Sequence, residues 1–100
     1  MYLGGGEERD FVINKDVFLI GTDALAVDGI LKSRAAGEIQ AKITKEEDIY
    51  YIEDMNSANG TLVNGEILIY KEVRRLKEGD RITFADISYR FLTFCNNSII

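Results

Sequence analysis

Short apolar runs separated by turn-forming residues make up the pattern of this chain, and none suggests a long helix. Apolar and polar side chains alternate over residues 39–44, as in a strand with one buried face. The same segment is rich in helix formers, and Ile39 and Ile43 also stand four residues apart, so propensity favours helix and strand about equally. The β-branched and aromatic run at 49–53 favours a strand with a strand partner before it.

The strongest hairpin signal is the dipeptide Asn64-Gly65, which stands between two β-rich runs at 61–63 and 66–68. A type I′ turn needs a positive φ angle at both central residues, and asparagine and glycine tolerate that conformation. The sequence therefore predicts a tight hairpin here.

A second hairpin is predicted near the start of the chain, where turn-forming residues at 14–16 separate β-rich runs at 11–13 and 17–20. Other turns are expected at 45–48 and 77–80, and other strands at 81–84 and 87–94. Regular short strands with turns between them predict an all-β fold, an antiparallel β-sandwich of two sheets.

Length and composition set the expected domain organisation. With 100 residues, 46% of them hydrophobic and 29% charged, the chain is expected to form one folded domain. We place a flexible, glycine-rich linker at 1–9, the domain at 10–95 and a short tail at 96–100. The domain is expected to belong to a longer multidomain chain.

Charge and cysteine content narrow the expected partners. The chain has 17 acidic and 12 basic residues, for a net charge of -5, whereas nucleic-acid-binding domains usually carry a basic surface. No apolar stretch is long enough to span a membrane. Neither nucleic acid nor a membrane is therefore expected as a partner. The single cysteine, Cys95, excludes a disulfide framework and favours the reducing cytoplasm.

The lack of histidine removes the commonest catalytic base and metal ligand. No serine has an evident activating base, and no acid–base pair is clustered in the sequence. The sequence therefore predicts a protein that is not an enzyme and that has neither a cofactor nor a metal site.

Two motifs carry a family resemblance. Ser57–Gly65 reads S-x-N-G-T-x-V-N-G, and Leu76–Ile82 reads L-x-x-G-D-x-I. With these motifs the chain resembles the forkhead-associated (FHA) domain over residues 17–94. The resemblance implies an FHA/SMAD-like β-sandwich with a strand at 39–44. It also implies a protein–protein interaction module that binds phosphothreonine peptides through loops at one end of the sandwich.

The expected binding loops are those at 32–38 and 55–60, which lie together if strands 39–44 and 49–53 form a hairpin. A phosphate carries nearly two negative charges and several acceptor oxygens, so it favours the always-charged fork of arginine and nearby hydroxyl donors. The family supplies an Arg after the glycine that ends the second strand. It also supplies an S-R-x-H element at the start of the strand at 39–44.

This chain departs from the family pattern at the phosphate site. Thr22 follows Gly21 where the family has its Arg, and the family's Ser, Arg and His positions hold other residues. These are Gly37, Glu38 and Gln40. A carboxylate about 6 Å from a phosphate opposes it by roughly 3 kcal/mol per unit charge at an effective dielectric constant of about 20. The resemblance therefore implies a module whose phosphothreonine binding is weakened or lost.

Two alternatives remain open. Arg34 or Lys32 could replace the missing cation and preserve phosphothreonine binding. Making Ser33-Arg34 the S-R pair instead puts Ala36 at the His position and breaks the family spacing. The alternative of another class is a structural or assembly role within a larger protein.

The motif residues Asn59, Gly60, Thr61 and Asn64 match the family, and Asn59 suits loop bridging as well as binding of the peptide backbone. The predicted peptide-binding residues are Thr22, Arg34, Gly37, Glu38, Asn59, Gly60 and Thr61. The predicted structural residues are Gly21, Gln40, Asn64 and Gly65.

Overall fold

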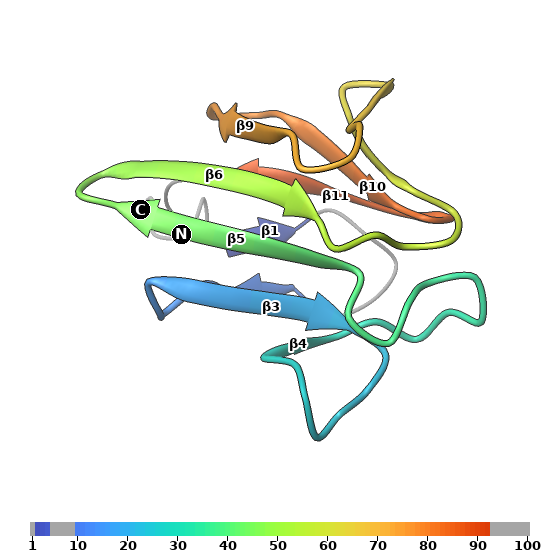
Figure 1. The fold of residues 1–100 in the computed structure, drawn as a ribbon. Helices are drawn as coiled ribbons and strands as arrows, with labels where there is room; N and C mark the ends of the chain where they lie inside the picture. The colour runs from blue at the N-terminus through green and yellow to red at the C-terminus, as the bar shows by residue number, and fades with distance from the viewer. Residues whose placement is uncertain (1, 5–9, 93–100) are drawn as a thin grey trace.

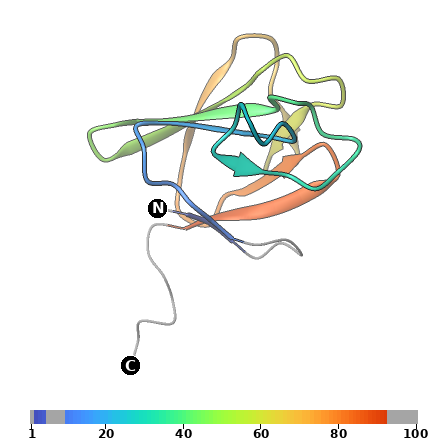
Figure 2. The same cartoon turned by 90° about the horizontal axis from the view of Figure 1, so that it is seen from below.

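Two β-sheets packed face to face form the computed structural model (Figure 1, and from below in Figure 2). It describes residues 2–4 and 10–92, which contain strands and turns and no helix. The described residues therefore contain no helix that could span a membrane. The all-β sandwich that the short apolar runs predict is confirmed.

The first sheet has 6 strands in the spatial order β2-β1-β11-β10-β7-β8. The neighbouring strands in it are antiparallel. Its members are β1 (Tyr2–Gly4), β2 (Phe11–Val12), β7 (Thr61–Val63), β8 (Glu66–Ile67), β10 (Arg81–Phe84) and β11 (Ile87–Leu92).

The second sheet has 5 strands in the order β4-β3-β5-β6-β9. Only the short pair of β3 and β4 is parallel; the other neighbours are antiparallel. Its members are β3 (Val17–Gly21), β4 (Gly29–Ile30), β5 (Ala41–Glu46), β6 (Ile49–Asp54) and β9 (Val73–Leu76).

The core lies between the sheets and is built by alternate residues of their strands. Tyr50 of the second sheet packs against Phe91 of the first, with ring centroids 5.4 Å apart. Phe11 stacks on Tyr89 at 5.0 Å. Since a strand turns successive side chains to opposite faces, the inward set is buried and the outward set forms the two outer faces of the sandwich. The largest fully buried hydrophobic side chains are Tyr89, Phe84, Phe91, Leu3, Ile20, Leu31, Ile43, Ile52, Ile82 and Val63.

The hairpin predicted around Asn64-Gly65 is confirmed. β7 pairs with β8, and the two turn residues have φ angles of 53° and 84°. The Asn64 side chain also reaches β10, because its Nδ2 donates to Asp80 at 3.0 Å and its Oδ1 accepts the Arg81 N–H at 2.9 Å. The turn therefore joins three strands of the first sheet.

The hairpin predicted from the runs at 11–13 and 17–20 is wrong. β2 pairs with β1 in the first sheet, whereas β3 pairs with β4 and β5 in the second. Phe11 and Phe18 both face the core, but from opposite sheets, with ring centroids 6.4 Å apart. The residues between Phe11 and Phe18 therefore connect one sheet to the other. Such a crossing connection contains the same turn-forming residues as a hairpin.

The prediction of a flexible linker at 1–9 is wrong for Tyr2–Gly4. These residues form β1, which lies between β2 and β11, and Leu3 is fully buried. The burial of one leucine side chain and pairing on both sides hold the strand despite the neighbouring glycines. Residues 1 and 5–9 lie outside the described part of the chain, as do Cys95 and the expected tail at 96–100.

The segment at 39–44, equally suited to helix and strand, contains a strand, but its boundaries differ from the prediction. β5 begins at Ala41 and continues to Glu46, so the expected turn at 45–48 is shortened to the residues around Glu47. Ile39 precedes the strand and is 38% exposed. The last strand is described as far as Leu92.

Leu3→Ala should lower the free energy of unfolding by about 2–5 kcal/mol, because it leaves a cavity in the core. Urea denaturation measures the change. Val12→Ala, at a 65% exposed position of neighbouring β2, is the control and should cost less than about 1 kcal/mol. An equally small effect of Leu3→Ala would show that β1 does not belong to the folded core.

Candidate functional site

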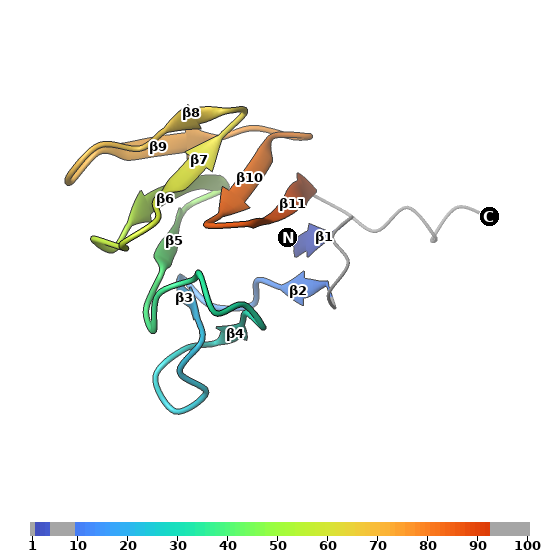
Figure 3. The same cartoon turned by 90° about the vertical axis from the view of Figure 1, so that its right-hand side faces the viewer.

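The loops after β3, β4 and β6 gather at one end of the sandwich, on the right of Figure 1 and facing the viewer in Figure 3. Backbone hydrogen bonds join the first two: Thr22 N–H donates to the Gly37 carbonyl at 3.1 Å, and Asp23 N–H donates to the Glu38 carbonyl at 3.2 Å. The structure therefore brings together three of the predicted site positions, 22, 37 and 38.

Gly21 makes this approach sterically feasible. A Cβ atom at this position would lie 2.0 Å from the Glu38 carbonyl oxygen, so any larger residue would push the second loop away from β3. The structural role predicted for this glycine has a direct physical basis in that contact.

Gln40 connects the two expected binding loops, at 32–38 and 55–60, from the inside of the domain. Its side chain is fully buried, and its Oε1 accepts the Gly37 N–H at 2.7 Å. Its Nε2 lies 2.9 Å from the Gly60 carbonyl and 3.0 Å from the hydroxyls of Ser57 and Thr61. One neutral amide thus fixes the loop before β5 to the loop after β6 and leaves no buried polar atom of its own unpaired.

The half-buried Asp54 completes this network. Its Oδ1 accepts hydrogen bonds from the hydroxyls of Ser57 and Thr61, each at 2.6 Å, and its Oδ2 accepts the Ser57 N–H at 2.9 Å. Thr61 is fully buried, so its hydroxyl is engaged within the domain, between Asp54 and Gln40. These hydrogen bonds fix the backbone of the exposed turn at 55–60 from its inner side.

Asp54 and Ser57 were not assigned a role from the sequence. Aspartate and serine next to a turn usually read as solvent-facing turn formers. Their spacing, with serine three residues after aspartate and threonine four residues later, is the signal that could have indicated a closed hydrogen-bonded turn.

Asn59 joins the two loops at the surface. Its Nδ2 donates to the Ala35 carbonyl at 2.8 Å, and the residue is exposed. The loop-bridging contact is therefore present, while its predicted contact with a peptide backbone stays a prediction.

The charged residues of the loop at 32–38 are exposed. The side chains of Lys32, Arg34 and Glu38 form no hydrogen bond or ion pair within residues 2–4 and 10–92. Ser33, in contrast, donates its hydroxyl to Asp86 at 2.6 Å, in the turn between β10 and β11. The start of the loop is therefore held at that turn, with a cation on either side of Ser33.

A titratable group also stabilises the loop after β3. Asp28 accepts the Leu19 N–H at 2.9 Å and the Lys15 ammonium at 2.8 Å. The backbone hydrogen bond first, and then the lysine, lower the pKa of the Asp28 carboxyl below its usual value of 3.8. The loop is therefore closed at its base by an ionised carboxylate.

The family model of the FHA domain matches residues 18–85. The chain belongs to the FHA domain family. FHA domains are protein-interaction modules that bind phosphopeptides, and relatives of this chain bind phosphopeptides of partner proteins.

Protein FraH of Nostoc sp. (strain PCC 7120) is 40% identical over 57 residues, which are 57% of this chain and 20% of FraH. The FHA chain thus spans about a fifth of that protein. EmbR of Mycobacterium tuberculosis, solved in complex with a low-affinity phosphopeptide, is 26% identical with a TM-score of 0.82, covering 91% of this chain and 24% of EmbR. The FHA domain of CT664 from Chlamydia trachomatis is 18% identical with a TM-score of 0.82, over 94% and 98% of the two chains.

Gln40→Ala should lower the free energy of unfolding by about 2–4 kcal/mol, because it leaves the Gly37 N–H and buried oxygens without partners. Amide hydrogen exchange should accelerate at 36–38 and 57–61. Asn59→Ala removes one exposed hydrogen bond and should cost less than about 1 kcal/mol. If the two variants unfold at the same urea concentration, the buried amide does not hold the loops.

Proposed function

We propose that this FHA domain is a protein–protein interaction module with a degenerate phosphate site, so that phosphothreonine binding is weakened or lost. The supporting observation is the meeting of positions 22, 37 and 38, which hold a threonine, a glycine and a glutamate. None of these side chains is a cation, and the Thr22 hydroxyl lies 3.4 Å from the Gly37 carbonyl, to which it donates. The partner would contact these residues and the exposed turn at 55–60.

The size of the expected loss follows from the missing interactions. A bidentate, charge-assisted arginine–phosphate contact contributes about 1.5–3 kcal/mol, or about one to two orders of magnitude in affinity. Glu38 adds repulsion, which is reduced by screening because the residue is exposed. The proposed module therefore binds phosphorylated and unphosphorylated peptides with similar affinity.

The same proposal covers the wider setting of the domain. Its role is binding and not catalysis, since no histidine or clustered acid–base pair is available in the sequence. It acts within a longer protein, in keeping with its share of FraH, and in the cytoplasm, in keeping with a single cysteine.

Restoring the family residues tests the proposal. The variant Thr22→Arg/Gly37→Ser/Glu38→Arg should bind phosphothreonine peptides about 100-fold more tightly than the unmodified chain, as measured by calorimetry with a phosphothreonine peptide library. The larger residue fits at position 37, because a Cβ there would approach no atom closer than 3.5 Å.

Unphosphorylated peptides of the same sequences are the control. The triple variant should bind the phosphorylated peptides more tightly than these controls, whereas the unmodified chain should bind both forms with similar affinity. Micromolar binding by the unmodified chain that disappears on dephosphorylation would contradict a lost phosphate site.

A second candidate function is phosphothreonine binding through Arg34 or Lys32. Its supporting observation is that both cations are exposed and unpaired within the described residues, on either side of the anchored Ser33. If the unmodified chain binds phosphopeptides, Arg34→Ala should reduce the affinity at least about tenfold without changing the urea midpoint. Arg81→Ala, at an exposed position of β10, provides the matched control. Equal affinities of all three chains would refute this function.

A further inference from the structure

β9 forms an edge of the second sheet, where its pairing partner is β6 and no described strand lies on its other side. An open edge presents unpaired backbone N–H and C=O groups to another extended chain. β9 has 4 residues, whereas the other edge strands, β2, β4 and β8, have 2 each. Within the described residues it is therefore the edge best suited to accept an added strand.

Positive charge is concentrated at this edge. Residues 71–77, KEVRRLK, contain four cations and one anion in a chain whose net charge is -5. Lys71, Arg75 and Lys77 are exposed and form no ion pair with any residue in the described ranges. The edge therefore carries a local charge opposite in sign to that of the whole chain.

Arg74 has a separate role. Its Nη1 lies 2.8 Å from Glu66 on β8 of the other sheet, and its Nη2 lies 2.6 Å from Glu72. Glu72 also accepts the Ile69 N–H at 3.0 Å, and this bond first, then Arg74, lowers the pKa of the Glu72 carboxyl. The crossover from β8 to β9 is thus held by its own ion pairs, which leave Arg75 and Lys77 available, while the Lys71 ammonium lies over the Tyr70 ring, 5.4 Å from its centroid.

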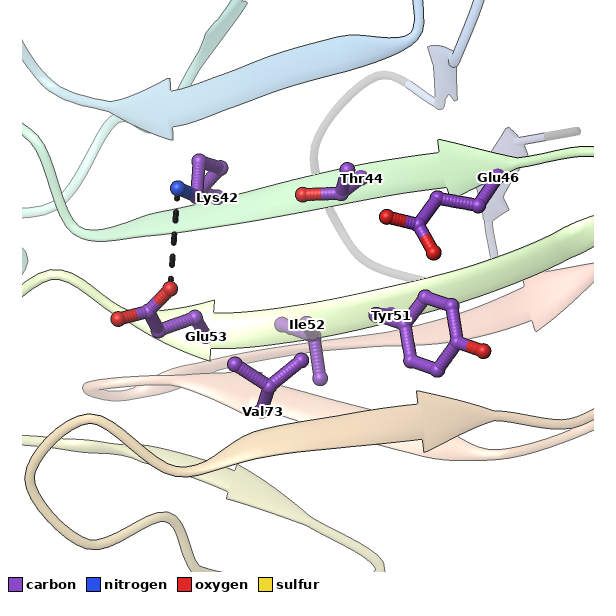
Figure 4. A pocket seen from close by; sticks show the side chains of 7 residues that line it. All are labelled: Lys42, Thr44, Glu46, Tyr51, Ile52, Glu53 and Val73. Carbon is purple, nitrogen blue, oxygen red and sulfur yellow. Dashed lines mark ion pairs between the residues drawn. The ribbon is translucent and has the colours of Figure 1, made fainter.

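Apolar side chains accompany these cations. Val73 is 57% exposed on the outer face of the sheet, and in the crossover Ile69 and Tyr70 are 67% and 75% exposed. Val73, Tyr51 and Glu53 line a pocket of about 310 Å³ on this face. Figure 4 shows these side chains on neighbouring strands β6 and β9. The outward positions of β9 are therefore one apolar residue and, two positions later, one cation, Arg75.

We propose that the β9 edge accepts an extended acidic segment of a partner protein as an added strand. Backbone hydrogen bonds would supply much of the affinity. A carboxylate beside Arg75 and an apolar side chain beside Val73 would supply the specificity, because directly opposite side chains in a sheet interact. A second copy of this chain is a poor occupant, since it would place two positively charged β9 segments together.

The probe is a short synthetic peptide with the repeat Val-Thr-Asp-Thr, titrated into the isotope-labelled chain at low salt and followed by NMR. Because alternate residues of a strand share one face, its valines and aspartates lie on the same face and can meet Val73 and Arg75. Backbone amide shifts should change along 73–76 and in neighbouring 50–53, and not at 22–40. Arg75→Glu should weaken binding about tenfold, and high salt should weaken it further. Arg81→Glu makes the same charge change at an exposed position of β10 in the other sheet and should leave the affinity unchanged.

Arg75→Gln serves as a second variant if charge reversal alters folding, and it should weaken binding by a smaller factor. Equal binding of a peptide with lysine in place of each aspartate would overturn the proposal, as would shifts confined to 22–40. Binding of the chain to phosphatidylglycerol vesicles without binding of the acidic peptide would also overturn it, in favour of a membrane surface. The proposed contacts lie on β9, outside the loops at 32–38 and 55–60, so a failure of this proposal leaves the proposal about the phosphate site unchanged.

Discussion

The buried amide of Gln40 is the interaction on which the binding end depends. It accepts a hydrogen bond from Gly37 on one loop and donates toward Ser57, Gly60 and Thr61 on the other. A neutral amide offers both donors and an acceptor, so it can satisfy two loops without the cost of burying a charge. The histidine that the family resemblance implies at this position, when neutral, also offers one donor and one acceptor, so glutamine can make the same two kinds of hydrogen bond.

Below the surface, buried polar groups determine the path of the loops; above it, exposed side chains determine what the loops contact. Gln40 and Thr61 belong to the first set, together with the half-buried Asp54 that bonds to Thr61, and Glu38 belongs to the second. Because these sets make separate contacts, exposed residues can change while the loop backbone stays in place. This separation supports the proposal that the FHA fold is kept while the phosphate site is degenerate.

Local chemistry was enough to predict some elements. Asn64-Gly65 needs only its own φ preferences to form a hairpin, and the prediction is correct. The runs around Phe11 and Phe18 also signal two strands, but only long-range packing decides that they join different sheets. β1 was missed because a strand of 3 residues beside glycines has almost no local signature, and its stability comes from strands on either side.

The candidate site divides in the same way. That the loops at 32–38 and 55–60 lie at one end could be expected from the hairpin of β5 and β6, whereas position 22 was added to them only by the family resemblance. The bonds of Asp54 could not be read from composition, since a turn-forming aspartate looks the same whether it faces water or a buried hydroxyl. The cations at 71–77 are visible in the sequence, but their place at a sheet edge depends on strand order.

The position of β1 has a consequence for synthesis of the chain. Residues 2–4 leave the ribosome well before β11, at residues 87–92, which is one of their two partner strands. Until then β1 can pair only with β2, and a two-stranded ribbon of this size is marginal in water. The first sheet therefore closes late, after its far strands have been made, and Leu3 stays exposed to chaperones and proteases throughout that interval.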